Sequence, residues 1–185
     1  MKKRIWSFHL KISLEIIYFD LSILNSSSMW FFIKNTSPVL RGGFRQFKTS
    51  YLKPFPLPIL KDIEEQKPFI EKADFMIEKN KQFYEAKKKF IKLVKYKYNL
   101  DKTSRKLDTF YNLNFKEFVN EIQDKNKVMS IEQESELMDF FEKNKKEILK
   151  IKEDINKTDE EINKMVYKLY ELNPAEIKII EESLK

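Results

Sequence analysis

Several residue types are scarce or missing, and each absence excludes a class of chemistry. The chain of 185 residues contains no cysteine, two adjacent glycines and one histidine, His9. Without cysteine there is no disulfide framework, no zinc–thiolate site and no cysteine nucleophile, which is typical of a reducing intracellular setting. Two adjacent glycines cannot supply a Walker loop or a GxGxxG fingerprint. We therefore expect no cofactor site and no metal site in this chain, and no enzyme that acts alone.

Long apolar runs are missing as well. Three basic residues open the chain as in an export signal, but charged side chains interrupt the stretch that follows and no small-residue cleavage site appears. A membrane span requires about 20 apolar residues, and no segment approaches that length. We expect a cytoplasmic protein without a membrane partner, and we leave residues 1–18 unassigned.

The formal net charge of +7 is unevenly distributed along the chain. Residues 1–60 carry nine lysines and arginines against two acidic side chains, whereas residues 61–185 carry equal numbers of both signs. Both glycines, both tryptophans and four of the six prolines also lie in the first part. The composition therefore predicts two regions, a basic one over residues 1–60 and a charge-balanced one over residues 61–185. Within the first, residues 19–60 are expected to form a domain, and residues 1–18 are unassigned.

Residues 19–60 predict a small α/β element. The apolar pattern of residues 19–34 predicts a short buried helix, which a run of serines caps or interrupts. The glycine pair predicts a loop, and the alternation of aromatic and polar side chains over residues 44–49 predicts a strand with one solvated face. The proline-rich run 54–58 predicts a stiff spacer that closes this region.

Residues 61–185 predict helices with capping signals at their starts. The first long helix runs to about Tyr98, and shorter helical stretches follow between residues 107 and 122. A second long helix begins after residue 130, and a last helix begins at Pro174. The capping signals are Asp62 with Glu65, Ser130 with Gln133, and Asn173 with Glu176.

The second long helix has the clearest period in the chain, and it is typical of a coiled-coil seam of about five heptads. With a weaker seam on the first long helix, it predicts an antiparallel helical hairpin or pairing with partner helices. Three polar positions in the two seams, Asn80, Asn144 and Thr158, are expected to fix the register. The seam positions are Leu137, Phe141, Asn144, Ile148, Ile151, Ile155, Thr158, Ile162, Met165, Leu169 and Leu172.

A basic and aromatic segment around the glycine pair has the residue types that DNA contact needs. Lysine and arginine neutralise phosphates, a glycine pair lets the backbone approach closely, and arginine can bind guanine in the major groove. A basic surface loop of a lysine-rich protein would show the same composition, so that alternative stays open. The candidate DNA-binding residues are Arg41, Gly42, Gly43, Arg45, Lys48, Tyr51 and Lys53.

Several separated stretches resemble a known family in its own order. They are Leu21–Ile33 with its Leu-Asn-Ser motif, Arg41–Lys48 with Arg-Gly-Gly, Tyr51–Pro58, and the helical stretches around residues 65–74, 113–118 and 162–172. Together they resemble the end of the target recognition domain and the helical tail of type IIG restriction-modification enzymes and adenine-specific DNA methyltransferases with a TaqI-like specificity domain. The resemblance covers about residues 19–185.

The resemblance implies a specificity fragment of a restriction-modification system that binds double-stranded DNA. The complete relative would methylate N6 of adenine or cut DNA, with S-adenosylmethionine and Mg²⁺ as cofactors bound elsewhere. Its methyltransferase part would be a domain or subunit encoded elsewhere, because the only Asn-Pro here, Asn173-Pro174, is a helix cap and no Asn-Pro-Pro-Tyr motif occurs. This chain thus looks like the C-terminal piece of a larger enzyme.

The expected fold class is α+β but mainly α. It combines a small α/β remnant of a target recognition domain over residues 19–60 with a long antiparallel helical hairpin over residues 61–185. The leading function is DNA sequence recognition without catalysis in this chain. The alternative is a helical structural or interaction module that does not bind DNA.

Overall fold

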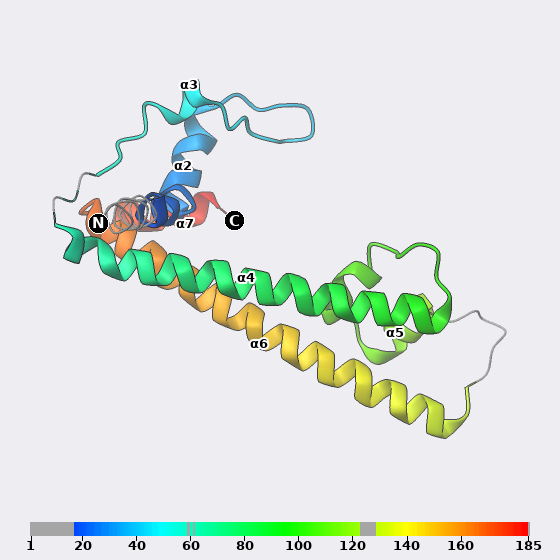
Figure 1. Cartoon of the computed structure of the whole chain (residues 1–185). Coiled ribbons are helices and arrows are strands. Elements are labelled where there is room, and N and C mark those ends of the chain that lie inside the picture. Colours follow the sequence, from blue (N-terminus) through cyan, green and yellow to red (C-terminus); the bar gives the residue numbers. More distant parts are fainter. Residues whose placement is uncertain (1–16, 59, 61, 123–128, 185) are drawn as a thin grey trace, which may run out of the picture. The chain divides into compact units, whose positions relative to one another are not determined.

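The computed structural model describes residues 17–58, 60, 62–122 and 129–184. These residues are mainly helical, as the sequence predicts (Figure 1). Residues 17–24 are helical and precede the first labelled helix. The labelled elements are α2 (Ser27–Thr36), α3 (Thr49–Leu52), α4 (Ile63–Tyr98), the 3₁₀ helix η1 (Leu107–Asn112), α5 (Phe115–Ile122), α6 (Ile131–Leu169) and α7 (Pro174–Ser183).

The strand predicted over residues 44–49 is wrong. In the described part of the chain, the only β pairing is an isolated antiparallel bridge between Val39 and Arg45. The alternating aromatic side chains do not mark a buried face, because Phe44 and Phe47 are 71% and 54% exposed. Backbone hydrogen bonds close locally instead, and the chain enters α3 at Thr49. The expected α/β element is therefore a helix followed by a hairpin-like loop, without a sheet in the described residues.

The chain packs as two compact units. Unit 1 comprises Met1–Ile77 with Lys157–Lys185, and unit 2 comprises Glu78–Asn156. Composition divides the chain at residue 60, whereas packing places the start of α4 and the end of α6 with the N-terminal region. The two long helices therefore each contribute residues to both units.

Unit 1 is built around buried apolar side chains from residues 17–24, α2, α4 and α6. Phe19 meets Phe69 of α4 edge to face, with 5.3 Å between the ring centroids. The buried Ser22 hydroxyl donates to the Phe69 carbonyl at 3.1 Å, which ties the first helix to α4. The buried members are Phe19, Ile23, Met29, Ile33, Phe55, Phe69, Ile162 and Val166.

Helix α2 is fixed at both ends within unit 1. Ser26 is its N-cap, so the serine run does interrupt the helical stretch predicted over residues 19–34. At the same end, the Ser27 N–H donates to Asn163 Oδ1 of α6 at 2.7 Å. At the other end, the Lys34 ammonium donates to the Ser183 carbonyl at the end of α7. These contacts set where the chain leaves α2.

Unit 2 has an aromatic core. Phe90 of α4 stacks on Phe110 of η1 with 3.6 Å between the ring centroids, and Phe118 of α5 stacks on Phe141 of α6 at 4.5 Å. The short elements η1 and α5 thus supply the aromatic rings that α4 and α6 pack against. The buried members are Phe90, Val94, Leu107, Phe110, Leu113, Phe118, Ile122, Leu137, Phe141 and Ile148.

Within unit 2, α4 and α6 run antiparallel, as their seams predict. The Lys79 ammonium pairs with Asp154 at 2.7 Å, whereas Phe90, further along α4, stacks with Phe140 at 5.4 Å. Later residues of α4 therefore meet earlier residues of α6. Lys145 of α6 also donates to the Leu113 carbonyl at 2.7 Å, which ties α6 to the segment between η1 and α5.

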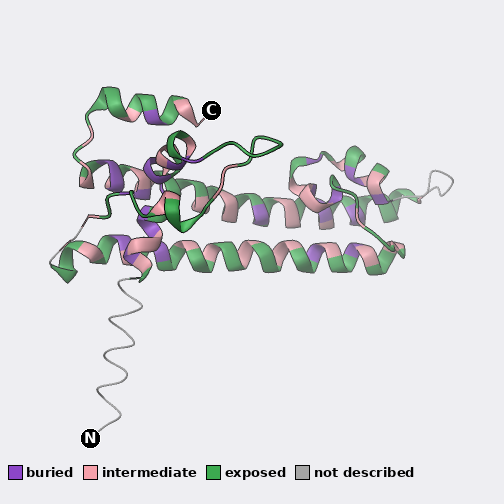
Figure 2. Ribbon diagram, turned by 90° about the horizontal axis from the view of Figure 1, so that it is seen from above, coloured by how far each residue is buried: buried purple, intermediate pink, exposed green. Residues whose placement is uncertain are grey.

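The seam of α6 faces inward in each unit (Figure 2). Leu137, Phe141 and Ile148 are buried in unit 2, and Thr158 and Ile162 are buried in unit 1. The other seam positions of this helix are half-buried. The 4,3 spacing of apolar residues therefore identified the packed face of α6 correctly.

The three polar seam residues differ in burial and in their hydrogen bonds. The Asn144 side chain donates to the Phe140 carbonyl of its own helix at 2.7 Å, and the Asn80 side chain is exposed. Of these three polar residues, only Thr158 is buried. Asn144 therefore satisfies its amide locally.

The helix caps follow the sequence signals. Ser130 and Gln133 exchange backbone-to-side-chain hydrogen bonds, and Asn173 and Glu176 form a complete capping box. The Asp62 carboxylate accepts from the Glu64 N–H at 3.0 Å at the start of α4. Asn114 and Glu117 form a further reciprocal cap before α5, which was not among the predicted caps. Among the described helices, none combines the length and apolarity needed to cross a membrane.

Candidate nucleic-acid interface

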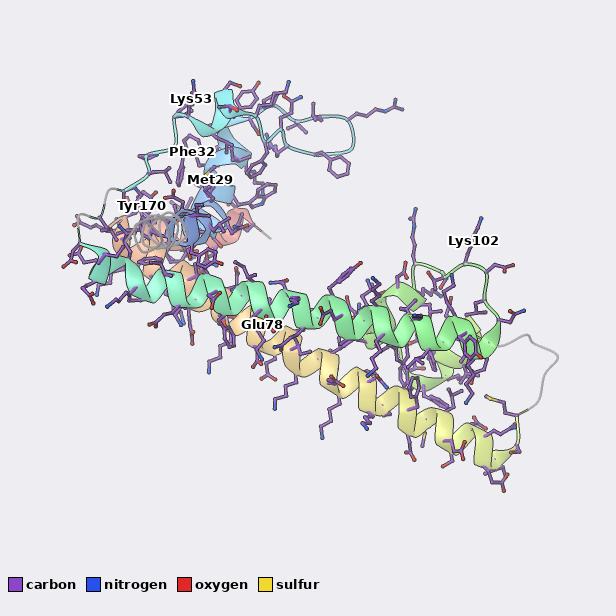
Figure 3. The ribbon with its side chains drawn as sticks, in the orientation of Figure 1. Met29, Phe32, Lys53, Glu78, Lys102 and Tyr170 are labelled. Atoms are coloured by element: carbon purple, nitrogen blue, oxygen red, sulfur yellow. The ribbon has the colours of Figure 1, made fainter. Side chains whose placement is uncertain are left out.

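The candidate DNA-binding residues lie in and after the loop that follows α2 (Figure 3). The loop is a tight hairpin, in which the Leu40 N–H donates to the Phe44 carbonyl at 2.8 Å and the Gly43 N–H donates to the Leu40 carbonyl at 3.0 Å. Arg41 and Gly42 are therefore the central residues of a β-turn. Most of this loop is exposed (Figure 2).

The glycine pair is needed for the backbone conformation of the turn. Gly42 has a φ of +87° and Gly43 a φ of +81°, both in the left-handed region that side chains disfavour. A Cβ at Gly42 would also lie 3.1 Å from the Phe44 ring, whereas a Cβ at Gly43 would meet nothing within 4 Å. The glycines thus shape the turn, and Gly43 also leaves open space beside the backbone.

The basic candidates separate into exposed and structural side chains. Arg41 at the turn is exposed, and so are Lys48 at the N-cap of α3 and Lys53 at its C-cap. Arg45 is half-buried and its guanidinium donates to the Ser37 carbonyl at 2.7 Å, across the base of the loop. Arg41, Lys48 and Lys53 are therefore available to a ligand, while Arg45 holds the loop together.

Tyr51 does not belong to the exposed set. Its half-buried side chain packs against the apolar cluster of unit 1. Exposed apolar side chains occur instead on the loop, where Phe47 stacks on Trp30 with 6.0 Å between the ring centroids. The alternation over residues 44–49 predicted a half-buried strand for Phe44 and Phe47, and no local pattern separates that case from an exposed loop. The exposed apolar residues are Trp30, Val39, Leu40, Phe44 and Phe47.

The chain after the loop is anchored on the unit 1 core. Phe55 is buried and meets Phe32 of α2 edge to face at 5.2 Å, and it also contacts Tyr170 at 5.9 Å. The Tyr170 hydroxyl donates to the Pro56 carbonyl at 2.7 Å. Burial of the phenol raises the pKa of Tyr170 to about 12. The loop therefore leaves from the fixed end of α2 and returns to a fixed point on the core.

The described residues offer no group of three or more histidine, aspartate and glutamate side chains that could hold a metal ion. His9 lies outside the described residues. The candidate residues of the loop are arginine, lysine, glycine and tyrosine, which offer positive charge and hydrogen-bond donors.

Comparison with known proteins identifies one matching family. The family model described as "Domain of unknown function (DUF8810)" matches residues 62–166, which include α4, η1, α5 and most of α6. No curated protein and no solved structure matches the chain. The loop after α2 precedes the matched residues.

Proposed function

The chain belongs to the DUF8810 family, whose description names no activity. We propose from the residues that this protein binds double-stranded DNA through the loop after α2. In this proposal it is the specificity fragment of a restriction-modification system, and residues 19–60 are the end of a target recognition domain. The complete relative would be an adenine-specific N6 DNA methyltransferase or a restriction enzyme. Its S-adenosylmethionine would be bound by a methyltransferase domain or subunit encoded elsewhere.

The observation that carries the proposal is an exposed basic turn whose two ends are held against the core of unit 1. Arg41 stands at the turn, and the open backbone at Gly43 allows an atom of a ligand to approach within contact distance. Lys48 and Lys53 flank α3 and are exposed, and Figure 3 shows Lys53 at the outer side of that helix. A phosphate backbone needs this combination of positive side chains and close backbone access.

The charge distribution agrees with this choice of ligand. Residues 1–60 hold a net charge of +7, whereas residues 61–185 sum to zero. A basic region of this kind attracts DNA before any specific contact forms, because the field of the phosphates extends about 10 Å at 0.1 M salt. Binding should therefore weaken steeply as salt is added.

The test uses fluorescence anisotropy with the full chain and a labelled duplex, repeated with the methyltransferase subunit present. The variant Arg41→Gln with Lys48→Gln should weaken binding and reduce the salt slope by about 2, since each phosphate contact contributes about 0.9. The matched control is Lys164→Gln with Lys168→Gln, which removes two exposed lysines of α6 in the same unit. Equal binding by the loop variant and the wild type would refute the proposal.

A second candidate is an interaction module that binds a protein partner and not DNA. The exposed apolar side chains of the loop favour it, because Phe44 and Phe47 present aromatic surface to solvent. Charge removal at Arg41 and Lys48 should leave such an assembly intact, whereas Phe44→Ser should weaken it. The double variant Arg41→Gln with Lys48→Gln and the variant Phe44→Ser therefore distinguish DNA binding from binding of a protein partner.

A further inference from the structure

The even charge total of residues 61–185 conceals a strong separation of charge within unit 2. Residues 87–106 contain nine lysines and arginines and a single acidic residue, Asp101, for a net charge of +8. Residues 107–142 contain nine acidic and three basic residues, for a net charge of −6. The basic part comprises the second half of α4 and the chain that follows it, and Figure 3 shows Lys102 directed away from the ribbon there.

Several lysines of α4, including Lys81 just before this stretch, share the outer face of the helix. At 100° per residue, Lys81, Lys88 and Lys92 lie within about 40° of one another around the helix. The wholly buried Phe90 and nearly buried Val94 lie on the opposite side and face the core of unit 2. The exposed aromatic rings Tyr84 and Tyr96 border the lysines, at 62% and 88% exposure. We call Lys81, Tyr84, Lys88, Lys89, Lys92 and Tyr96 the α4 basic face.

The α4 basic face is not neutralised by its surroundings. None of its four lysines forms an ion pair with another residue in the described ranges. Between residues 79 and 100, Glu85 is the only acidic side chain; it lies on the same face, about 40° from Lys81, and leaves the four lysines an excess of three positive charges. A solvated helix face normally alternates both signs, whereas this one concentrates positive charge over about 17 Å of helix, from Lys81 to Lys92.

We propose that the α4 basic face is a second nucleic-acid site, which binds the phosphate backbone of duplex DNA without regard to sequence. Lysine ammonium groups neutralise phosphates as point charges, and tyrosine hydroxyls donate to phosphate oxygens. The α-helix places the backbone positions of its lysines in a row, from which the flexible side chains can reach phosphates, and duplex DNA presents about one charge per 1.7 Å along its axis. This site lies in unit 2 and does not rest on the loop after α2.

Two other occupants fit the α4 basic face less well. Single-stranded nucleic acid binds by stacking bases on free aromatic faces, but the Lys88 ammonium already lies 5.7 Å from the centre of the Tyr84 ring. A second copy of this chain could offer the acidic start of α6, where five carboxylates occur without a lysine over residues 131–142. Exposed protein ion pairs contribute only about 0–1 kcal/mol each, whereas duplex DNA supplies a denser row of charge.

The experiment compares two triple variants of the full chain, each of which removes three exposed lysines from unit 2. The test variant carries Lys81→Gln, Lys88→Gln and Lys92→Gln, and the control carries Lys143→Gln, Lys146→Gln and Lys150→Gln on α6. Binding to a labelled duplex of arbitrary sequence is measured by anisotropy across a salt series. Circular dichroism checks that both variants keep the wild-type helix content.

The test variant should reduce the salt slope by about 2 to 3 and weaken binding at 0.1 M salt by about tenfold to hundredfold, while the control changes both much less. Equal losses in the two variants, or no loss in either, would overturn the proposal. Tighter binding of a single strand of the same sequence would overturn the choice of duplex. A dimer in sedimentation velocity that only the test variant abolishes would identify a second copy as the occupant.

The loop proposal and this proposal fail separately. Arg41→Gln with Lys48→Gln removes only the loop's share of the salt slope, so adding Lys81→Gln, Lys88→Gln and Lys92→Gln to that variant should reduce the slope by about 2 to 3 more. If the loop variant alone abolishes all binding, the α4 proposal is refuted and the loop proposal stands. If the α4 triple variant alone abolishes all binding, the loop proposal is refuted and the α4 proposal stands.

Discussion

Phe90 is wholly buried in unit 2 and contacts three aromatic rings. Its truncation therefore tests how much this aromatic core contributes to the free energy of unfolding. Its ring stacks on Phe110 at 3.6 Å between centroids, lies parallel to Phe140 at 5.4 Å and is tilted against Phe118 at 5.6 Å. The three partners come from η1, α6 and α5. One side chain of α4 thus connects every helix that packs into this core.

The variant Phe90→Ala should lower the free energy of unfolding by about 4 kcal/mol. Truncation of a buried phenylalanine costs about 3–5 kcal/mol through lost apolar burial and the cavity left behind. Each aromatic pair contributes about 0.5–1.5 kcal/mol beyond its area, which places this site in the upper half of that range. The milder Phe90→Leu, which keeps an apolar group in the same space, should cost less than Phe90→Ala, because less of the buried volume is lost.

Urea denaturation followed by circular dichroism measures the loss. With an m-value of about 2 kcal/mol/M, the Phe90→Ala midpoint should fall by about 2 M. The matched control is Phe44→Ala, because Phe44 is 71% exposed and its truncation should change stability by no more than about 0.5 kcal/mol. A loss below about 1 kcal/mol for Phe90→Ala, or one equal to that of the control, would refute the aromatic core described here.

Two further predictions concern unit 1. Gly42→Ala should lower the melting temperature more than Gly43→Ala. Both positions have positive φ, which costs an alanine about 1–2 kcal/mol, but only a Cβ at Gly42 meets the Phe44 ring, at 3.1 Å. Equal shifts of the two variants in thermal denaturation would contradict this prediction. Tyr170 should ionise near pH 12 in the folded chain, above its ordinary pKa of 10.0. The folded state therefore binds the phenol proton more tightly, and this contribution to stability is complete below pH 10 and lost as pH rises toward 12. Tyrosinate absorbance of wild type and Tyr170→Phe measures the pKa, and a Tyr170 titration near pH 10 would contradict it.

The α6 seam and the helix caps could be predicted because they rest on local chemistry. The 4,3 period from Leu137 to Ile162 selects one face of a helix whatever that face packs against. Capping boxes such as Asn173 with Glu176 are closed by residues three apart, so no distant contact is needed. The start of α4 after Asp62 and its end at Tyr98 followed from the same kind of local signal.

The loop after α2 shows why the candidate site could be predicted only in part. Composition identified Arg41, Lys48 and the glycine pair, and the structure exposes both basic side chains. Composition could not show that Arg45 donates to Ser37 or that Tyr51 packs inward, because both depend on how the loop folds back on unit 1. The same dependence explains why alternation over residues 44–49 was mistaken for a strand. A strand needs a partner along its length, and in the described residues this segment has only the single bridge from Arg45 to Val39.

The sequence by itself determined the helical content, the packed face of α6, the caps and the excess of positive charge before residue 61. These features depend on the backbone, on periodicity and on neighbours a few residues away. Only the tertiary structure decided that α4 and α6 each serve two units, that η1 and α5 complete an aromatic core around Phe90, and that the outward lysines of α4 form one basic face. The reason is that burial is a property of the folded chain. Lys88 becomes part of a charged surface because Phe90, on the opposite side of the same helix, is buried in the core.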